Sequence, residues 1–502
     1  MSFPTPAVLA TVVVLGVTAL TAAAEPVHPK AIDWTACDPA VVASVPPVER
    51  AKLTCATQSV PIDHDNPGAG TLALAMMRRR ADDPAHRIGT LFLNIGGPGG
   101  SGFLYTRTAY TKFTPAVLAR FDIVGFDPRG VGRSDPLRCF TSQEQADQLL
   151  AQSVPVPVTT KQIDDTLDAA AQYSQDCKAN AGPLLGHMST KDVVRDLDDL
   201  RAAVGDSKLS YYGLSYGTLI GATYTAMYPN RVRAITLDGS VDPALRTSDG
   251  VTYLGQRAQG FELAMNAMLA RCEQSGGNCA LAPNAATKFA SLRDYLRGHD
   301  LTTPNGLKVT LSSFASDLVS WLQQPALFGQ LASELETDYQ LMQSTSAQLS
   351  TVQPQTPYLG DDSYYGVNCS DMPFPGRLDA ATIATAYEKT APTFGRYHAF
   401  QEPAQCPSWA ATSGSGYSGP WQNNSGTTVM VVSNYYDPAT RYAFAQQMVK
   451  ELGNARLVSV NAFGHTTLGD SACVARLTEA YLVNGQVPAA GQVCQPDSQP
   501  FS

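Results

Sequence analysis

The pentapeptide Gly213-Leu214-Ser215-Tyr216-Gly217 has the form G-x-S-x-G and stands between two segments of different periodicity. Residues 208–212 are typical of a strand and residues 218–227 of a helix. On such a strand-to-helix turn the serine is lifted out of the sheet, and its neighbours must be small because bulk would clash there. A serine hydroxyl needs a base to become a good nucleophile. The pattern therefore predicts that Ser215 is the nucleophile of an acyl-transfer site.

The residues that activate such a serine are expected in the order acid and then histidine, each in a loop after a late strand of a parallel sheet. Asp437 follows the β-branched segment 427–433 and precedes a helical pattern at 439–452. His465 follows a short strand pattern at 456–460. Both positions match the expected order.

The roles of these residues follow from their chemistry. His465 would take the proton of Ser215 as general base and return it to the leaving group, while Asp437 would fix the tautomer of the imidazole. Asp238, after the predicted strand 232–237, is the alternative acid, because some hydrolases place the carboxylate one strand earlier. It also suits an ordinary Asp-Gly turn.

A glycine-rich loop is expected to supply the oxyanion hole. The predicted strand 90–94 runs into residues 95–102, where missing side chains let backbone N–H groups approach a ligand. We assign the hole to the N–H groups of Gly97 and Tyr216. The same loop spells G-x-G-x-x-G, with Asp122 about twenty residues on, as in dinucleotide sites. That alternative explains neither the serine turn nor the late histidine.

Strand and helix patterns alternate along much of the chain, which predicts an α/β fold with a mostly parallel sheet. Helical patterns dominate between about 242 and 421 and indicate an inserted helical cap. The expected segments are a signal peptide at 1–24, the first part of an α/β-hydrolase core at 25–241, the cap at 242–421 and the second core part at 422–502. The strands are expected at 72–77, 90–94, 121–126, 209–212, 232–237, 427–433 and 456–460.

Several stretches resemble one known group of proteins. They are GGPGG at 96–100, GFDPRGVGRSDP at 125–136, the segment 211–243 around the serine, DPAT at 437–440 and GHTTL at 464–468. On these motifs the chain resembles secreted peptidases of the α/β-hydrolase superfamily, in the proline iminopeptidase and tripeptidyl aminopeptidase group. The likeness runs from about residue 34 to 494. It departs at Ile95, where relatives usually have proline or histidine.

The resemblance implies a serine aminopeptidase that acts on peptides with a free N-terminus. Such an enzyme needs a carboxylate to bind the substrate ammonium, and Asp371 is the first candidate, with Glu334 and Glu336 behind it. An esterase or amidase acting on a small molecule is the alternative, and a hydrolase-fold binding protein is a third hypothesis. Asp127 and Arg129 are interpreted as supports of the oxyanion loop, or else as a structural turn with a surface ion pair.

The amino end indicates secretion. Residues 7–24 are apolar, too short for a confident membrane span, and small residues precede Glu25. We expect cleavage there and no stable membrane association afterwards, although the segment before residue 7 has no lysine or arginine, which leaves an uncleaved anchor open. Ten cysteines, all beyond this segment, fit an oxidising compartment, with free buried thiols as the alternative. Short loops and the resemblance favour Cys37–Cys55, Cys139–Cys177, Cys272–Cys279, Cys369–Cys406 and Cys473–Cys494.

Composition fits a large hydrolase core with a cap. The chain has 502 residues, 44% hydrophobic and 16% charged, and its formal net charge of -9 argues against nucleic acid as a partner. The seven histidines lack metal-ligand spacing, so no metal or cofactor is expected. The oligomeric state stays open.

Overall fold

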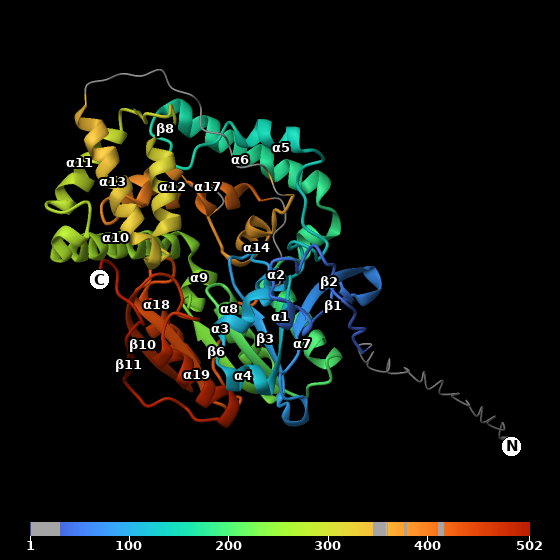
Figure 1. Cartoon of the computed structure of the whole chain (residues 1–502). Helices are drawn as coiled ribbons and strands as arrows, with labels where there is room; N and C mark the ends of the chain where they lie inside the picture. The colour runs from blue at the N-terminus through green and yellow to red at the C-terminus, as the bar shows by residue number, and fades with distance from the viewer. Residues whose placement is uncertain (2–30, 345–357, 359, 376–378, 410–415) are drawn as a thin grey trace.

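A nine-stranded sheet occupies the centre of the part that the computed structural model describes, namely Met1 and residues 31–344, 358, 360–375, 379–409 and 416–502 (Figure 1). The strand order is β1-β2-β4-β3-β5-β6-β9-β10-β11. β1 pairs antiparallel with β2, and β2 with β4, whereas all other pairs are parallel. The strands are β1 Leu53–Pro61, β2 Thr71–Arg79, β3 Gly89–Asn94, β4 Phe121–Phe126, β5 Leu209–Leu214, β6 Val232–Asp238, β9 Val429–Tyr436, β10 Ala455–Phe463 and β11 Gln492–Cys494.

All seven expected strands are present in this sheet, where β1 and β11 are additional, and β7 Leu301–Thr302 and β8 Lys308–Val309 form a separate two-stranded sheet. Side chains of the nine-stranded sheet alternate between its two faces, as the pleat requires. In β3, Phe92 packs in the hydrophobic cluster on one face, while Leu91 and Leu93 pack in the cluster on the other. The helices α7 Thr190–Ala203, α8 Gly217–Met227 and α18 Tyr442–Leu452 cover the first face, and α4 Pro115–Arg120 and α19 Ala472–Asn484 cover the second. The structure is therefore an α/β hydrolase fold, as predicted.

A helical layer lies over the carboxyl ends of the parallel strands (Figure 1). Its helices are α9 Pro243–Ser248, α10 Gly250–Ser275, α11 Ala285–Leu296, α12 Leu311–Trp321, α13 Phe328–Gln343, α14 Ser363–Asp371, α15 Ala380–Glu388, α16 Gly395–Ala399 and α17 Glu402–Gln405. Two earlier helices, α5 Gln143–Leu150 and α6 Thr160–Asn180, join this layer, because Tyr173 of α6 donates a 2.5 Å hydrogen bond to Asp362. The layer has its own apolar core around Phe261, Met265 and Phe314.

Five disulfides link the chain in the pairing that the resemblance favours: Cys37–Cys55, Cys139–Cys177, Cys272–Cys279, Cys369–Cys406 and Cys473–Cys494. Cys369–Cys406 joins α14 to the end of α17 within the cap, and Cys473–Cys494 joins α19 to the edge strand β11. Residues 2–24 of the expected signal segment and residues 345–357, 359, 376–378 and 410–415 of the expected cap lie outside the described residues. None of the helices in the described part of the chain combines the length and the hydropathy of a membrane-spanning segment.

Candidate active site

Ser215 occupies the sharp turn between β5 and α8. Its φ of 56° lies in the left-handed region, which is strained for a residue with a side chain. The flanking glycines are required sterically: a Cβ on Gly213 would lie 2.4 Å from the Gly217 carbonyl oxygen, and one on Gly217 would lie 2.8 Å from the Asn94 carbonyl oxygen. The Ser215 N–H donates to the Asp238 carbonyl oxygen at 2.9 Å, which ties the turn to β6. The turn has the backbone geometry of a nucleophile elbow.

His465 and Asp437 form a hydrogen-bonded pair. The Nδ1 atom of His465 lies 3.0 Å from Oδ1 and 2.9 Å from Oδ2 of Asp437, whose side chain is 0% exposed. The backbone N–H groups of Ala439 and Thr440 donate to Oδ1 of Asp437 at 3.0 and 2.8 Å. The Thr440 hydroxyl donates to Oδ2 at 3.1 Å and lies 3.3 Å from Nδ1 of His465. With Nδ1 facing a carboxylate, the imidazole has Nε2 available for a substrate or a serine.

The loop that carries His465 is held by Asn434 of β9. Its side-chain amide nitrogen donates to the carbonyl oxygens of Phe463, Gly464 and Thr466 at 3.3, 3.0 and 2.9 Å. Sequence reasoning did not single out Asn434, because a polar residue inside a strand gives no sign of its partner. This buried amide fixes the path of the backbone on both sides of the imidazole.

Asp238, the alternative acid, has different partners. Its carboxylate accepts hydrogen bonds from the Thr467 N–H at 3.0 Å, the Thr467 hydroxyl at 2.9 Å and the Tyr212 hydroxyl at 2.9 Å. Burial raises its pKa to about 6. The structure thus places Asp437, and not Asp238, against the imidazole.

The glycine-rich loop after β3, residues 95–102, packs closely against the turn that carries Ser215. A Cβ on Gly96 would meet the Leu214 carbonyl oxygen at 2.5 Å, the Ser215 Cβ at 2.8 Å and the Tyr216 nitrogen at 2.9 Å. Gly96 and Gly97 have φ values of 84° and 106°, which favour glycine. Asp127 holds the end of this loop by accepting a 2.6 Å hydrogen bond from the Ser101 hydroxyl.

Arg129, the second residue interpreted as a support, lies elsewhere. It is fully buried, binds Asp196 at 2.6 and 2.8 Å and donates to the carbonyl oxygens of Pro61, Ile62 and His187. The alternative of a surface ion pair is wrong, because both side chains are 0% exposed. Arg129 therefore joins β1 to α7 and does not reach the glycine loop directly.

A small chamber adjoins Ser215 beneath the cap. Its volume is about 20 Å³, room for about one water molecule. The core contributes Gly97, Ser215, Tyr216, Val241, Ala439 and Thr440, and the cap contributes Arg246, Tyr253, Arg257, Tyr364 and Asn368. Thr440 also lies 3.3 Å from Nδ1 of His465, so this residue connects the chamber beside Ser215 with the histidine pair.

Glu402 lies behind the cap wall of the chamber. Its Oε1 accepts hydrogen bonds from the Tyr364 hydroxyl at 2.6 Å and the Asn368 amide at 3.2 Å, and Nη1 of Arg257 is 3.8 Å away. Oε2 is buried and accepts no hydrogen bond from any described residue. The only sequence signal at Glu402 is an acidic residue at a helix start, which is common in structural helices, so sequence reasoning missed it.

The three expected ammonium ligands lie outside the chamber lining. Asp371 accepts hydrogen bonds from the N–H and hydroxyl of Thr190 at 2.9 and 2.5 Å, and burial raises its pKa. Glu336 pairs with Lys288 at 2.7 Å. Glu334 lines a separate cavity within the cap. The structure therefore corrects these assignments, because none of these carboxylates reaches the lining beside Ser215.

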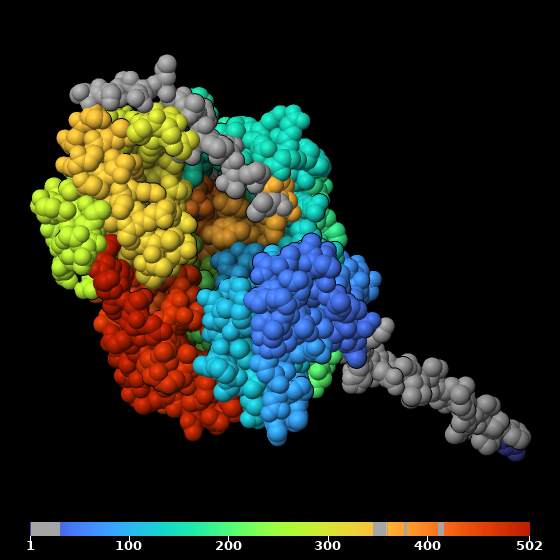
Figure 2. Space-filling view, viewed as in Figure 1, coloured from blue at the N-terminus to red at the C-terminus, as the bar shows by residue number. Residues whose placement is uncertain are grey.

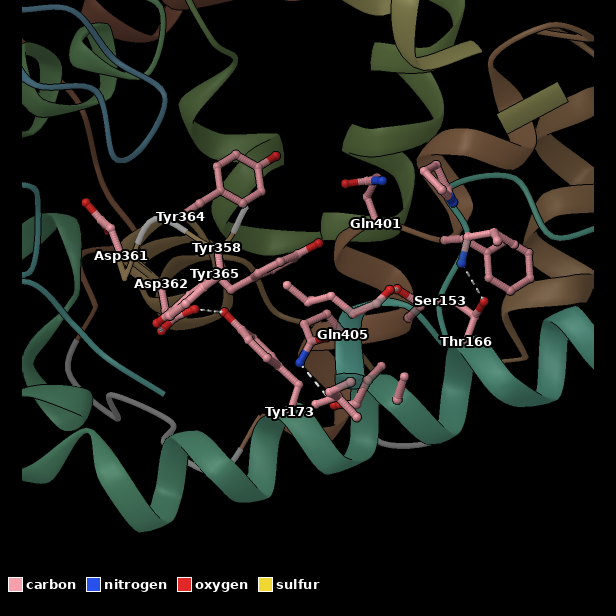
Figure 3. A pocket seen from close by; sticks show the side chains of 18 residues that line it. Ser153, Thr166, Tyr173, Tyr358, Asp361, Asp362, Tyr364, Tyr365, Gln401 and Gln405 are labelled. Carbon is pink, nitrogen blue, oxygen red and sulfur yellow. Dashed lines mark hydrogen bonds between the residues drawn. The ribbon is translucent and has the colours of Figure 1, made fainter. Parts of the chain in front are cut away.

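A second cavity, of about 300 Å³, lies on the other side of Tyr364, which lines both spaces. Figure 3 shows aromatic side chains around it, with Tyr173 rising from α6 and Gln405 donating to the Ala170 carbonyl oxygen at 3.1 Å. Two carboxylates lie in its otherwise mostly apolar wall, and both are hydrogen-bonded: Asp362 accepts from Tyr173 and Tyr358, and Asp361 accepts from the N–H groups of Gly132 and Ser363.

A mostly parallel sheet that ends one strand in a strained serine turn, with a carboxylate-bound histidine in a loop after a later strand, defines an α/β hydrolase. The family described as TAP-like protein matches residues 391–494. Serine protease Hip1 of Mycobacterium tuberculosis is 30% identical, over 94% of this chain and 92% of that protein. Carboxylesterase B of the same organism is 30% identical over 92% of this chain and 90% of that protein, and tripeptidyl aminopeptidase of Streptomyces lividans is 28% identical over 93% and 87%. The chain belongs to the family of α/β hydrolases that includes these relatives. It is a serine hydrolase of the peptidase type.

Proposed function

We propose that this chain is a secreted serine aminopeptidase that releases short N-terminal pieces of peptides through an acyl-enzyme on Ser215. The relatives named serine protease and tripeptidyl aminopeptidase support a peptide substrate. Five disulfides support an oxidising, extracytoplasmic compartment.

The chemistry assigns one role to each polar group. Ser215 attacks the scissile carbonyl carbon while Nε2 of His465 takes the hydroxyl proton, and Asp437 stabilises the imidazolium. The C–N bond then breaks, and the same proton passes to the leaving amine. Water attacks the resulting ester, gives one proton to His465 and releases the acid, whereupon the proton returns to Ser215. The N–H groups of Gly97 and Tyr216 would stabilise the oxyanion at both steps.

The observation that carries the aminopeptidase mode is the unpartnered oxygen of Glu402. A buried acceptor without a donor costs about 1–3 kcal/mol, and more when it is charged. A substrate ammonium entering past Tyr364 would supply the missing donor, and it would add a second positive charge to that of Arg257, whose Nη1 atom is 3.8 Å from Oε1. Burial raises the pKa of Tyr364, so its hydroxyl stays a neutral donor to Glu402. The chamber is too small for an acyl unit as it stands, so we infer that Tyr364 shifts toward the 300 Å³ aromatic cavity when substrate binds.

Glu402→Gln tests this assignment with matched chromogenic substrates that differ only in a free or acetylated N-terminus. We expect kcat/KM for the free-amine substrate to fall about 100-fold, as when one partner of a buried charge pair is lost. Glu334→Gln and Glu336→Gln are controls on the same cap and should change it by less than about twofold. An equal loss on both substrates would show that Glu402 is only structural.

The relative named carboxylesterase B supports the second candidate, an esterase or amidase for small molecules. Turnover by the wild-type enzyme distinguishes the esterase from the aminopeptidase. Rapid turnover of N-blocked esters without turnover of free-amine peptides would select the esterase, and the reverse would select the aminopeptidase.

A further inference from the structure

A groove of about 700 Å³ runs along the histidine side of the site. His465 lines it, whereas Ser215 does not. One wall comes from the cap, from Gln323 to Gly329, and the other comes from the loop after His465 and the C-terminal residues 496–501. Figure 2 shows the C-terminal segment, in red, against the yellow cap helices.

The cap wall is fixed to the histidine loop. The His465 N–H donates to the Gln323 carbonyl oxygen at 3.0 Å. Gly464 is packed so tightly on Pro325 that an added Cβ would lie 2.5 Å from its Cδ. The backbone at Gly464 and His465 therefore packs directly against the first residues of the cap wall, Gln323 and Pro325.

The chamber beside Ser215 and the groove beside His465 differ in volume and in the catalytic residue that lines them. The chamber beside Ser215 has about 20 Å³ and the groove beside His465 about 700 Å³. In acyl transfer the protonated imidazole gives its proton to the leaving amine, so the leaving part of a peptide must lie on the imidazole side. Polar side chains such as Gln324, Asn278 and Lys112 along the groove can pair with main-chain amides.

We propose that this groove binds the peptide chain on the carboxyl side of the scissile bond, so that the enzyme recognises the leaving peptide as well as the N-terminal piece. This inference rests on the proposed aminopeptidase function. The occupant is an extended polypeptide segment that begins at the new amino terminus, next to His465, and continues between the cap wall and the C-terminal residues.

Gly329→Trp tests the proposal with little risk to folding. Gly329 lies in α13, lines the groove, and an added Cβ there would meet nothing within 4 Å. The neighbouring Gln330→Trp is the control, because Gln330 is exposed and does not line the groove. Two substrates share one free N-terminal acyl unit and differ in the leaving group, which is p-nitroaniline or a peptide of six residues.

We expect Gly329→Trp to lower kcat/KM for the long peptide by about tenfold or more, mainly through KM, and to leave p-nitroanilide turnover within about twofold. Gln330→Trp should change neither. Unchanged cleavage of the long peptide, or an equal loss on both substrates, would overturn the proposal. The proposed function is judged separately, by whether the wild-type enzyme turns over the free-amine p-nitroanilide.

Discussion

Two carboxylates at the ends of neighbouring strands form hydrogen bonds with different residues of the loop that carries His465. Asp437, just after β9, contacts the imidazole of His465, whereas Asp238, the last residue of β6, binds Thr467 two residues further on. Both side chains are almost fully buried. The partner in the loop, and not burial or position at the sheet edge, distinguishes an acid that can act on histidine from one that anchors the backbone.

The largest expected difference between the two carboxylates is in turnover. Asp437→Asn should lower kcat by about 10⁴-fold, because an amide cannot hold the same tautomer or stabilise the imidazolium. Asp238→Asn is the matched control and should lose less than about tenfold, since it leaves the imidazole contact intact. Steady-state kinetics on a free-amine p-nitroanilide measures both. A deep loss in Asp238→Asn, with an unchanged circular dichroism spectrum, would reverse the assignment.

A smaller effect is expected at the hydroxyl that joins Asp437 to His465. Thr440→Val keeps the shape of the side chain but removes the donor to Oδ2 of Asp437. A hydrogen bond to a charged group contributes about 1.5–3 kcal/mol, so kcat/KM should fall roughly 10- to 100-fold. Thr467→Val removes the corresponding hydroxyl from Asp238 and should affect turnover much less. Equal losses in the two variants would mean that the loop responds as one unit.

The sequence already predicted much of this arrangement. Ser215, Asp437 and His465 could be proposed as the catalytic residues because strand patterns, glycines and order along the chain are local signals, and the same patterns predicted seven strands of the sheet. Choosing between Asp437 and Asp238 required the structure, because both follow strands and only tertiary packing sets their partners. The disulfide pairing was predicted from short loops together with the resemblance.

The position of Glu402 beside the chamber could not be predicted from sequence patterns. Its contacts, Tyr364, Asn368 and Arg257, come from α14 and α10, which are distant in the sequence. Asp371, chosen as the ammonium ligand instead, faces Thr190 of α7. Which carboxylate lies near the chamber depends on how the cap helices pack, and helical periodicity does not determine that.

Asp238→Asn should also lower the stability of the fold, apart from its effect on turnover. Asp238→Asn replaces a carboxyl group, which carries at most one proton, with an amide whose NH₂ carries two hydrogens and faces the Thr467 and Tyr212 donors. A buried polar group left unsatisfied costs about 1–3 kcal/mol, so the free energy of unfolding should fall by that amount in urea denaturation at pH 5. An unchanged midpoint would show that Asp238 does not anchor the loop.

The smallest expected effect is the pH dependence of that loss. Burial raises the pKa of Asp238 from 3.8 to about 6, so the folded protein holds this proton more tightly than the unfolded chain. Its contribution is therefore fully present below pH 3.8 and is lost as the pH rises through 6. The Tm difference between wild type and Asp238→Asn should shrink from pH 4 to pH 7.5, while all other titrations cancel in the comparison. A difference that grows with pH would mean that Thr467 and Tyr212 stabilise the charged carboxylate more than burial penalises it.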